Sequence, residues 1–387
     1  MTNNKSTLAG KMTQYRWVIC AMLFFATTVN YLDRQVLSLT WDEFIKPEFH
    51  WNEYHYGLIT SIFSIVYAVC MLFAGRFIDW MGTKKGYLWA IGVWSLGACL
   101  HALCGVATEA WVGLPNAAAL RAVEAGSAVA ATIAMVSMYF FIAARCILAL
   151  GEAGNFPAAI KVTAEYFPKK DRAYATSIFN AGASIGALFA PLTIPLLAKA
   201  WGWEMAFIVI GALGFVWMGF WVFMYKKPSE HPRVNAAELE YIEQDKHEVI
   251  DGAVAKEETE DECPKMSFWK TLSFKQTWAF AFGKFMTDGV WWFFLFWTPS
   301  YLNSQFGIKM SEGLGVALIF TLYAITMLSI YGGKLPTIII NKTGLNPYAA
   351  RMRAMLIFAF FPLLVLLAQP LGTISPWFPI ILIGIGG

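Results

Sequence analysis

Long apolar runs separated by short polar segments make up most of this chain. A helix that crosses a bilayer needs about 20 mostly apolar residues, and about nine runs reach this length. They lie near residues 17–39, 57–79, 85–106, 137–160, 174–197, 205–225, 277–300, 313–333 and 352–370. A tenth run, from Pro376 to Gly387, has about 11 residues, which is too few to cross. The pattern predicts an all-α polytopic membrane protein.

The composition agrees with this class. Hydrophobic residues make up 58% of the sequence and charged residues 14%, against roughly 45–50% and 25% in soluble domains. The six cysteines include no Cys-x-x-Cys spacing and no regular series with histidine, so we expect neither a disulfide framework nor a metal site. We also expect no cofactor and no nucleic-acid partner.

The positions of Lys and Arg predict the orientation. The loops between the spans alternate between two sides of the membrane. Most of the 29 Lys and Arg residues lie in the loops of one side, and those of the other side hold only Lys46, Arg121, Lys199 and Lys309. Because cytoplasmic loops carry an excess of Lys and Arg, we expect a multi-pass protein of the inner (plasma) membrane with its N-terminus in the cytoplasm. The first apolar run has no Ala-x-Ala cleavage pattern, so it is expected to remain as the first helix.

A long polar stretch divides the chain into two parts. We expect residues 1–225 to form an N-terminal six-helix bundle and residues 276–387 an incomplete C-terminal bundle. Residues 226–275 between them are rich in charge and predict a solvated cytoplasmic linker with a surface helix near Ala236–His247. The Ala-rich residues 107–136 form an insertion between spans three and four, either a helical excursion outside the membrane or a re-entrant segment.

The loop between spans two and three carries a specific motif. Gly75, Asp79, Gly82, Lys84 and Lys85 fit the pattern G-x-x-x-D-x-x-G-x-[RK]-[RK]. The first Gly allows close helix packing, and Gly82 ends the helix. Asp79 is placed to accept backbone N–H groups or to pair with a cation. The loop is similar to the cytoplasmic gating loop of the major facilitator superfamily, which implies gating roles for all five residues.

Two charged pairs fall inside spans of the first half. A charge at the bilayer centre costs roughly 2.5–3.5 kcal/mol, so such residues are candidates for a transport path. Asp33 and Arg34 are adjacent and point about 100° apart, so they face different neighbours, unless both lie at the outer interface. Arg145 and Glu152 are two turns apart on one face. They form either a proton-loading site or a structural ion pair, and Gly154 with Pro157 predicts a kink there.

A third pair, Lys284 and Asp288, lies at i and i+4 in span seven, just before Trp291 and Trp292. A basic group can hold a carboxylate and aromatic rings can stack on a sugar, which makes these residues candidates for substrate binding. The alternatives are a self-neutralised pair and an interfacial aromatic belt. Two further polar candidates for substrate binding, each equally explained as a core residue, are Tyr67 in span two and Asn180 in span five.

Together these segments resemble the anion:cation symporter branch of the superfamily, and within it the hexuronate transporters, which carry glucuronate and galacturonate. The likeness rests on Asn30–Arg34, Arg145–Pro157, Glu165–Arg172 and Trp291–Pro299. It implies two pseudo-symmetric helix bundles, of which nine to ten of twelve spans are present. It also implies that Arg34 grips the substrate carboxylate, that Asp33 and Glu152 carry protons, and that Arg145 modulates Glu152.

We therefore expect a monomeric, proton-coupled carrier that takes up a hexuronate or similar small sugar acid by alternating access. One alternative is an organophosphate or other organic-anion exchanger in which Arg34 and Lys284 clamp a phosphate. Another is a membrane sensor that does not transport. The sequence contains no visible nucleophile–base pair and no nucleotide-binding loop, so we do not expect an enzyme.

Overall fold

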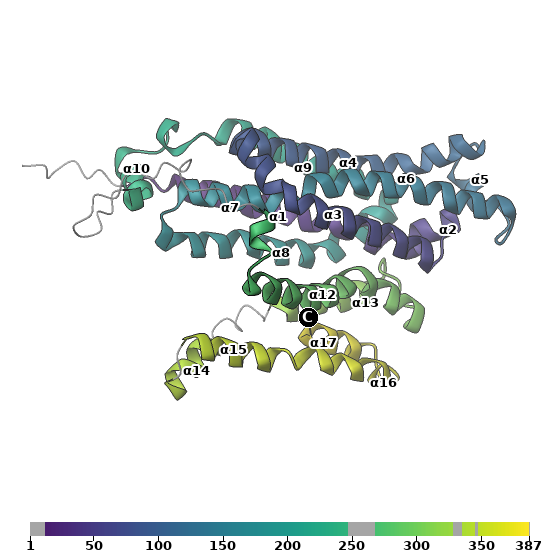
Figure 1. Ribbon diagram of the computed structural model, residues 1–387. Coiled ribbons are helices and arrows are strands. Elements are labelled where there is room, and N and C mark those ends of the chain that lie inside the picture. Colours follow the sequence, from purple (N-terminus) through teal and green to yellow (C-terminus); the bar gives the residue numbers. More distant parts are fainter. Residues whose placement is uncertain (1–11, 247–267, 328–334, 345–346, 387) are drawn as a thin grey trace, which may run out of the picture.

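The computed structural model describes residues 12–246, 268–327, 335–344 and 347–386, and the regular elements in these ranges are helical (Figure 1). The first half forms a bundle of long helices: α1 (Tyr15–Thr40), α3 (Glu53–Met81), α4 (Thr83–Val112), α6 (Ala128–Glu152), α7 (Asn155–Tyr166), α8 (Lys169–Trp201) and α9 (Trp203–Met224). Short elements join them: η1 (Trp41–Ile45), α2 (Lys46–Phe49) and α5 (Ala117–Ala122). Within this bundle α4 packs on α6 and α1 packs on α8.

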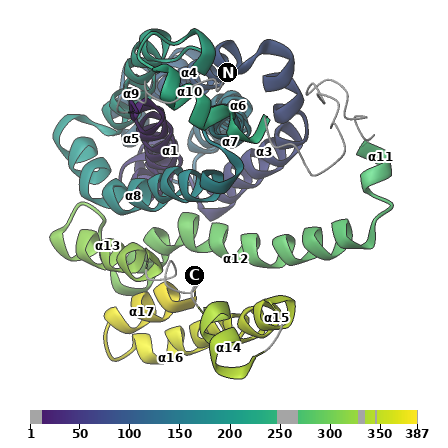
Figure 2. The ribbon, with the colours of Figure 1, turned by 90° about the vertical axis from the view of Figure 1, so that its left-hand side faces the viewer.

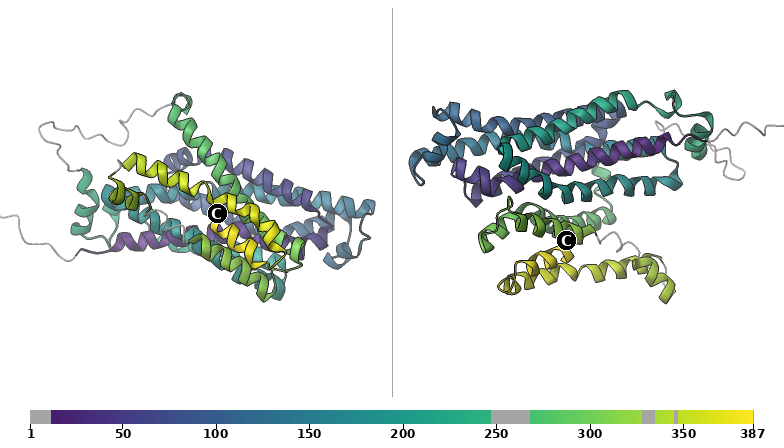
Figure 3. Two further views of the ribbon diagram at one scale, coloured as in Figure 1. Left: turned by 90° about the horizontal axis from the view of Figure 1, so that it is seen from below. Right: turned by 180° about the vertical axis from the view of Figure 1, so that it is seen from behind.

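The second half lies along one side of this bundle (Figures 2 and 3). It consists of α11 (Phe268–Thr271), α12 (Lys275–Phe306), α13 (Gly313–Met327), α14 (Leu335–Thr343), α15 (Pro347–Phe358), η5 (Phe361–Leu367), α16 (Ala368–Gly372) and α17 (Trp377–Gly386). The helix α12 runs next to the first bundle and contacts α1, while α13 contacts α8 and α17. Part of the predicted span 313–333 lies outside the described residues.

Six helical segments in the described part of the chain are long and apolar enough to cross a membrane: Glu53–Met81, Thr83–Val112, Ala128–Tyr166, Tyr174–Trp201, Trp203–Met224 and Ala349–Gly372. The helices α1 and α12 are also long, with 26 and 32 residues, but carry charged residues within their apolar runs. The end of the molecule at α10 (Ala236–Glu243) is called the inner end, and the end at α2 and α5 the outer end, after the expected orientation (Figure 1).

Residues 107–136 are helical over much of their length in the structure. They form the end of α4, the short helix α5 and the start of α6. The predicted fourth span therefore begins earlier than expected, at Ala128, because the Ala-rich sequence continues the helix outward. The predicted kink is present as a break between α6, which ends at Glu152, and α7, which begins at Asn155.

Glycines bring the helices of the first bundle into backbone contact. A Cβ on Gly182 of α8 would lie 2.4 Å from the Phe24 carbonyl oxygen, and one on Gly186 would lie 2.4 Å from that of Thr28. On α6, a Cβ on Gly151 would lie 2.2 Å from the Trp94 nitrogen of α4. Small residues thus fix α1 and α6, the two helices that carry the charged pairs of the first half, against their neighbours.

The linker helix α10 (Ala236–Glu243) is fastened to the inner end of α1. The Glu238 carboxylate is buried and accepts the backbone N–H groups of Tyr15 and Arg16, each at 3.1 Å, and the Arg16 guanidinium at 3.1 Å. Gln14, at the N-cap, supplies no side-chain cap itself. A carboxylate from a distant segment therefore caps α1, where the helix dipole favours negative charge. The expected surface helix is thus partly buried.

Candidate functional site

Arg34 of α1 and Glu152 of α6 form a buried ion pair at the centre of the first bundle. The Arg34 Nε donates to Glu152 Oε2 at 2.6 Å, and the two side chains are 1% and 0% exposed. Of the two alternatives for Arg145 and Glu152, the structural ion pair is not what the structure shows for Glu152, which pairs with Arg34; Arg145 interacts with Glu152 electrostatically. Residues seven apart on a helix are separated by about 10 Å along its axis, so α1, which crosses near Glu152, supplies the partner instead.

Three aromatic rings surround the Arg34 guanidinium. Its Cζ lies 4.5 Å from the ring centre of Tyr67 on α3, 5.0 Å from that of Trp292 on α12 and 5.1 Å from that of Tyr31 on α1. Contacts of this kind stabilise a desolvated cation. We call Tyr31, Tyr67 and Trp292 the Arg34 aromatic cluster. It joins two predicted substrate residues with Arg34 across the two halves of the chain.

Tyr31 was missed by the sequence analysis as a site residue. It precedes Arg34 by three positions on the same helix, and side chains at i and i+3 are neighbours on a helix surface. That spacing is the signal that could have identified it.

Asp33 is buried in the same region of the first bundle and interacts electrostatically with Arg34. Its side chain and that of Arg145 are buried, and each interacts electrostatically with the other and with Glu152. Among the described residues neither Asp33 oxygen has a hydrogen-bond partner, and the same holds for Nε and Nη1 of Arg145. Arg34 bonds Glu152, whereas Asp33 makes no such bond, so the two adjacent residues differ in their contacts. Two acids and two arginines therefore share one buried region with incomplete hydrogen bonding.

The other predicted substrate residues lie apart from the Arg34–Glu152 pair. Lys284 Nζ lies 2.7 Å from Asp288 Oδ1, and their side chains are 55% and 45% exposed, so the alternative of a self-neutralised pair describes them. Asp288 still interacts electrostatically with Tyr31. Trp291 is half-buried against the core, and Asn180 is exposed on α8.

The predicted gating loop has a partner on α7. Asp79 Oδ1 lies 2.7 Å from Lys161 Nζ, and Gly82 adopts a φ of 79° between α3 and α4, as a helix-ending glycine requires. Lys84 donates to the Val222 carbonyl at 2.8 Å, whereas Lys85 is exposed. The prediction of close packing at Gly75 is wrong, because no atom of the described residues lies within 4 Å of the position its Cβ would take.

A second polar group was also missed by the sequence analysis. Asp42 and Glu43, in the π-helical segment η1 directly after α1, contact Asn303 at the end of α12 and Ser311 in the loop that follows. The contacts span 261 and 268 positions of the chain, so no local pattern could have shown them. In the described part of the chain no three His, Cys, Asp or Glu residues are arranged to hold a metal.

Comparisons with known proteins agree on a family. Residues 23–387 match the model described as Major Facilitator Superfamily. The chain is 31% identical over 346 residues to the probable galactarate/D-glucarate transporter GarP of Escherichia coli K12, covering 87% of this chain and 70% of the relative. It is 29% identical to the hexuronate transporter of the same strain, covering 97% of this chain and 77% of that relative. It is 27% identical to the galacturonate transporter of Dickeya chrysanthemi, covering 84% of this chain and 83% of that relative.

Two solved structures of a bacterial homologue of the human lysosomal transporter Spinster, both inward-facing, share the fold. The occupied form has a TM-score of 0.59 and covers 96% of this chain and 73% of its own. The unoccupied form has a TM-score of 0.64, with 98% and 74% covered. Both are 17% identical in sequence, so the likeness extends to the fold alone.

Proposed function

This chain belongs to the Major Facilitator Superfamily, and from that premise we propose that it carries a hexuronate or a related sugar acid into the cell together with a proton. Access to the site alternates between the two sides of the inner membrane as the two halves of the chain rock against each other. The N-terminus and the linker lie on the cytoplasmic side. The observation that carries the proposal is the buried Arg34–Glu152 pair enclosed by aromatic rings.

Arg34 is suited to the carboxylate of a sugar acid. A guanidinium offers several N–H donors in a planar fork that matches a carboxylate. Of these, Nε is bonded to Glu152, while Nη2 has no partner among the described residues. The rings of Tyr67 and Trp292 pack against it, and aromatic side chains are common in the walls of small-molecule sites. The names of the relatives, which include hexuronates and galactarate, support the same substrate class.

Glu152 links the anion to a proton. Protonation removes the negative charge that neutralises Arg34. A buried charge that has lost its partner costs on the order of 3–5 kcal/mol, so a substrate carboxylate then takes the place of Glu152. Deprotonation of Glu152 restores the internal pair and expels the anion. Glu152 is thus in one of two states. It either carries a proton while the substrate binds Arg34, or it is ionised and pairs with Arg34 itself. Asp33 and Arg145 adjust the charge around it from the bundle interior.

The substitution Glu152→Gln tests this coupling in purified protein reconstituted into vesicles. Glutamine mimics the protonated acid, so uptake driven by an imposed proton gradient should be lost while exchange of labelled for unlabelled glucuronate continues. Glu240→Gln, at an exposed position of α10, is the matched control. Concentrative uptake at the wild-type rate by the Glu152 variant would show that the proton role is wrong. If the unaltered protein moved none of glucuronate, galacturonate and galactarate, the substrate class would be wrong.

The exchanger alternative requires Lys284 as the second ligand of a phosphate. Lys284 lies 2.7 Å from Asp288, which already neutralises it. The geometry therefore favours a single carboxylate on Arg34 over a phosphate clamp.

A further inference from the structure

We propose that η1 and the outer end of α12 form the outer gate of the transport path, built from a polar layer and an aromatic layer. This inference rests on the proposed transport function and goes beyond it by naming the residues that must separate for the site to open outward. The gate contacts lie between the two halves of the chain, and both layers are closed in this structure.

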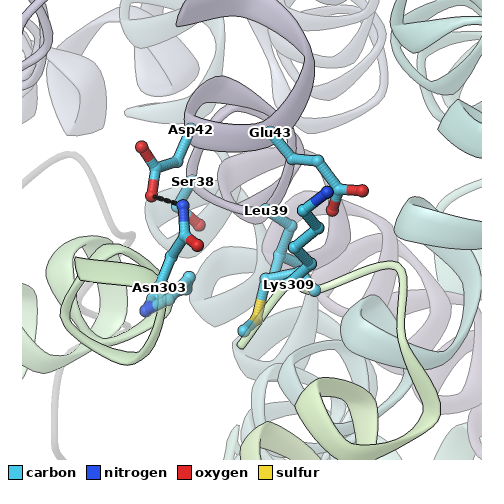
Figure 4. Close-up of a pocket in the computed structure, with 8 residues that line it drawn as sticks. Ser38, Leu39, Asp42, Glu43, Asn303 and Lys309 are labelled. Atoms are coloured by element: carbon cyan, nitrogen blue, oxygen red, sulfur yellow. Dashed lines mark hydrogen bonds between the residues drawn. The ribbon is translucent and has the colours of Figure 1, made fainter. Parts of the chain in front are cut away.

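The polar layer joins acids of the first half to neutral donors of the second (Figure 4). Asn303 Nδ2 donates to Asp42 Oδ2 at 2.7 Å. The backbone N–H of Ser311 donates to Glu43 at 3.1 Å, and its hydroxyl donates to the same carboxylate. Asp42, Glu43 and Asn303 border a small pocket that is also lined by Ser38 and Lys309.

The aromatic layer is formed by three large rings. Trp41 stacks on Tyr56 with ring centres 4.2 Å apart and planes at 5°, and both side chains are fully buried. The Tyr56 hydroxyl donates to the Phe296 carbonyl of α12 at 2.9 Å, and its ring meets Trp297 edge-on at 5.2 Å. The aromatic layer therefore joins η1 and α3 to α12, and the polar layer joins η1 to the second half as well.

The two ends of α12 differ in how deeply their side chains are buried, and a closed outer gate requires burial at the outer end. Near its inner end Phe280, Phe282 and Phe285 are 72%, 64% and 75% exposed. At its outer end Phe296, Thr298 and Leu302 are buried. The two halves of the chain are therefore packed together at the outer end of α12, and its inner end stands away from the first bundle (Figure 2).

The segment that carries the acids is anchored to the first half by stronger contacts. Glu48, just beyond η1, is buried and accepts Arg121 Nη2 of α5 at 2.5 Å and Trp203 Nε1 of α9 at 3.2 Å. Asp42 Oδ1 also pairs with Lys46 Nζ at 3.3 Å. When the halves separate, the contacts to neutral Asn303 and Ser311 break while the charged ones remain, because bonds between opposite charges are the stronger. A π-helical turn is a frequent feature of such functional sites.

The gate is tested by Asn303→Asp, which places a like charge opposite Asp42, with Ser304→Asp on the exposed side of α12 as the matched control. A reporter cysteine, Ser38→Cys, is labelled from outside with a membrane-impermeant maleimide, and protein without the reporter gives the background of the native cysteines. We expect Asn303→Asp to raise the labelling rate about tenfold, since it removes one hydrogen bond to a charged group. Ser304→Asp should leave the rate unchanged. Equal labelling rates in the two variants would show that the proposal of an outer gate is wrong.

A second variant, Asp42→Cys with Asn303→Cys, is cross-linked through a short bifunctional methanethiosulfonate, which forms a disulfide with each thiol. The cross-linked protein should lose vesicle uptake and regain it on reduction, while each single cysteine variant keeps uptake after the same treatment. Unchanged uptake by the cross-linked protein would also overturn the gate. Absence of uptake from the unaltered protein would instead count against the proposed function, so the two failures are distinguishable.

Discussion

Arg34 and Glu152 are 118 positions apart in the chain, and their side chains meet at 2.6 Å in a pair that is sealed from solvent. Because each is the counter-ion of the other, any ligand that binds one must first displace or neutralise the other. This relationship leads to the first prediction.

Replacing Arg34 by Ala should remove binding of sugar acids. Arg34→Lys should restore it only in part, because an ammonium keeps the charge but loses the planar fork. We expect the Ala variant to bind glucuronate on the order of 100-fold more weakly, measured by calorimetry on detergent-purified protein. Lys284→Ala is the comparison, and its effect should be smaller because Asp288 already pairs with Lys284. Unchanged affinity in Arg34→Ala would move the carboxylate site elsewhere.

Gly151→Ala should destabilise the first bundle. The new methyl group would lie 2.2 Å from the Trp94 nitrogen and 2.6 Å from the Ala90 carbonyl oxygen, so α4 and α6 must separate. Overpacking of this kind typically costs about 1–3 kcal/mol, and thermal unfolding in detergent measures it. Gly219→Ala on α9, where nothing lies within 4 Å, is the control and should melt as the wild type does. Equal melting of both variants would contradict the tight α4–α6 contact.

Glu238→Gln should loosen the linker from α1. Glutamine keeps the shape of the side chain but removes the charge that neutralises Arg16 and interacts with the helix dipole. We expect a loss of about 1–3 kcal/mol of stability, read from thermal unfolding. Glu240→Gln, on the exposed side of α10, should change it little. A Glu238 variant as stable as this control would show that the carboxylate does not fasten the linker.

The attachment of the linker should weaken in acid through His231. Burial and the neighbouring Arg233 and Lys226 lower its pKa, opposed by the Met224 carbonyl and Glu238. The ring stacks on Tyr15 at 4.2 Å, its Nε2 bonds the Met224 carbonyl at 3.1 Å, and Nδ1 accepts the Arg233 N–H at 3.1 Å. The neutral ring fits this arrangement, because a protonated Nδ1 no longer accepts.

Since the folded pKa lies below the ordinary value of about 6.5, His231 contributes stability above that pH and loses it as the pH falls through the folded pKa. Melting temperatures of wild type and His231→Gln, compared between pH 7.5 and roughly pH 5, check this. The wild type should lose more than the variant on acidification. A parallel loss in both would assign the pH effect to other groups.

The sequence predicted the fold well because apolar length and charge placement are local properties. Most predicted runs fall on one helix where the structure describes them, but 137–160 is divided between α6 and α7, and 352–370 between α15, η5 and α16. The break after Glu152 follows from Gly154 and Pro157. The start of α6 was placed late, because Ala-rich residues between 128 and 136 do not by themselves mark where a helix begins.

Arg34, Glu152, Tyr67 and Trp292 were predicted as site residues from the sequence, but the ion pair between Arg34 and Glu152 was not. A helix face shows that Arg145 and Glu152 share a side, yet only the crossing of α1 decides that Arg34 reaches Glu152 first. For the same reason the outer contacts of Asp42 and Glu43 could not be predicted, since their partners lie in the other half of the chain.

The break after Glu152 divides the segment Ala128–Tyr166 into α6 and α7. The helix α7 has 12 residues, begins three positions beyond Glu152, and carries Lys161 and Glu165 toward its far end. At 1.5 Å per residue, a tilt of roughly 10° about the break would move Lys161 by about 1.5 Å and Glu165 by about 2.5 Å. Displacements of that size break hydrogen bonds such as the 2.7 Å contact of Lys161 with Asp79. A tilt at this break would therefore be larger at Lys161 and Glu165 than at Glu152, because displacement grows with distance from the break.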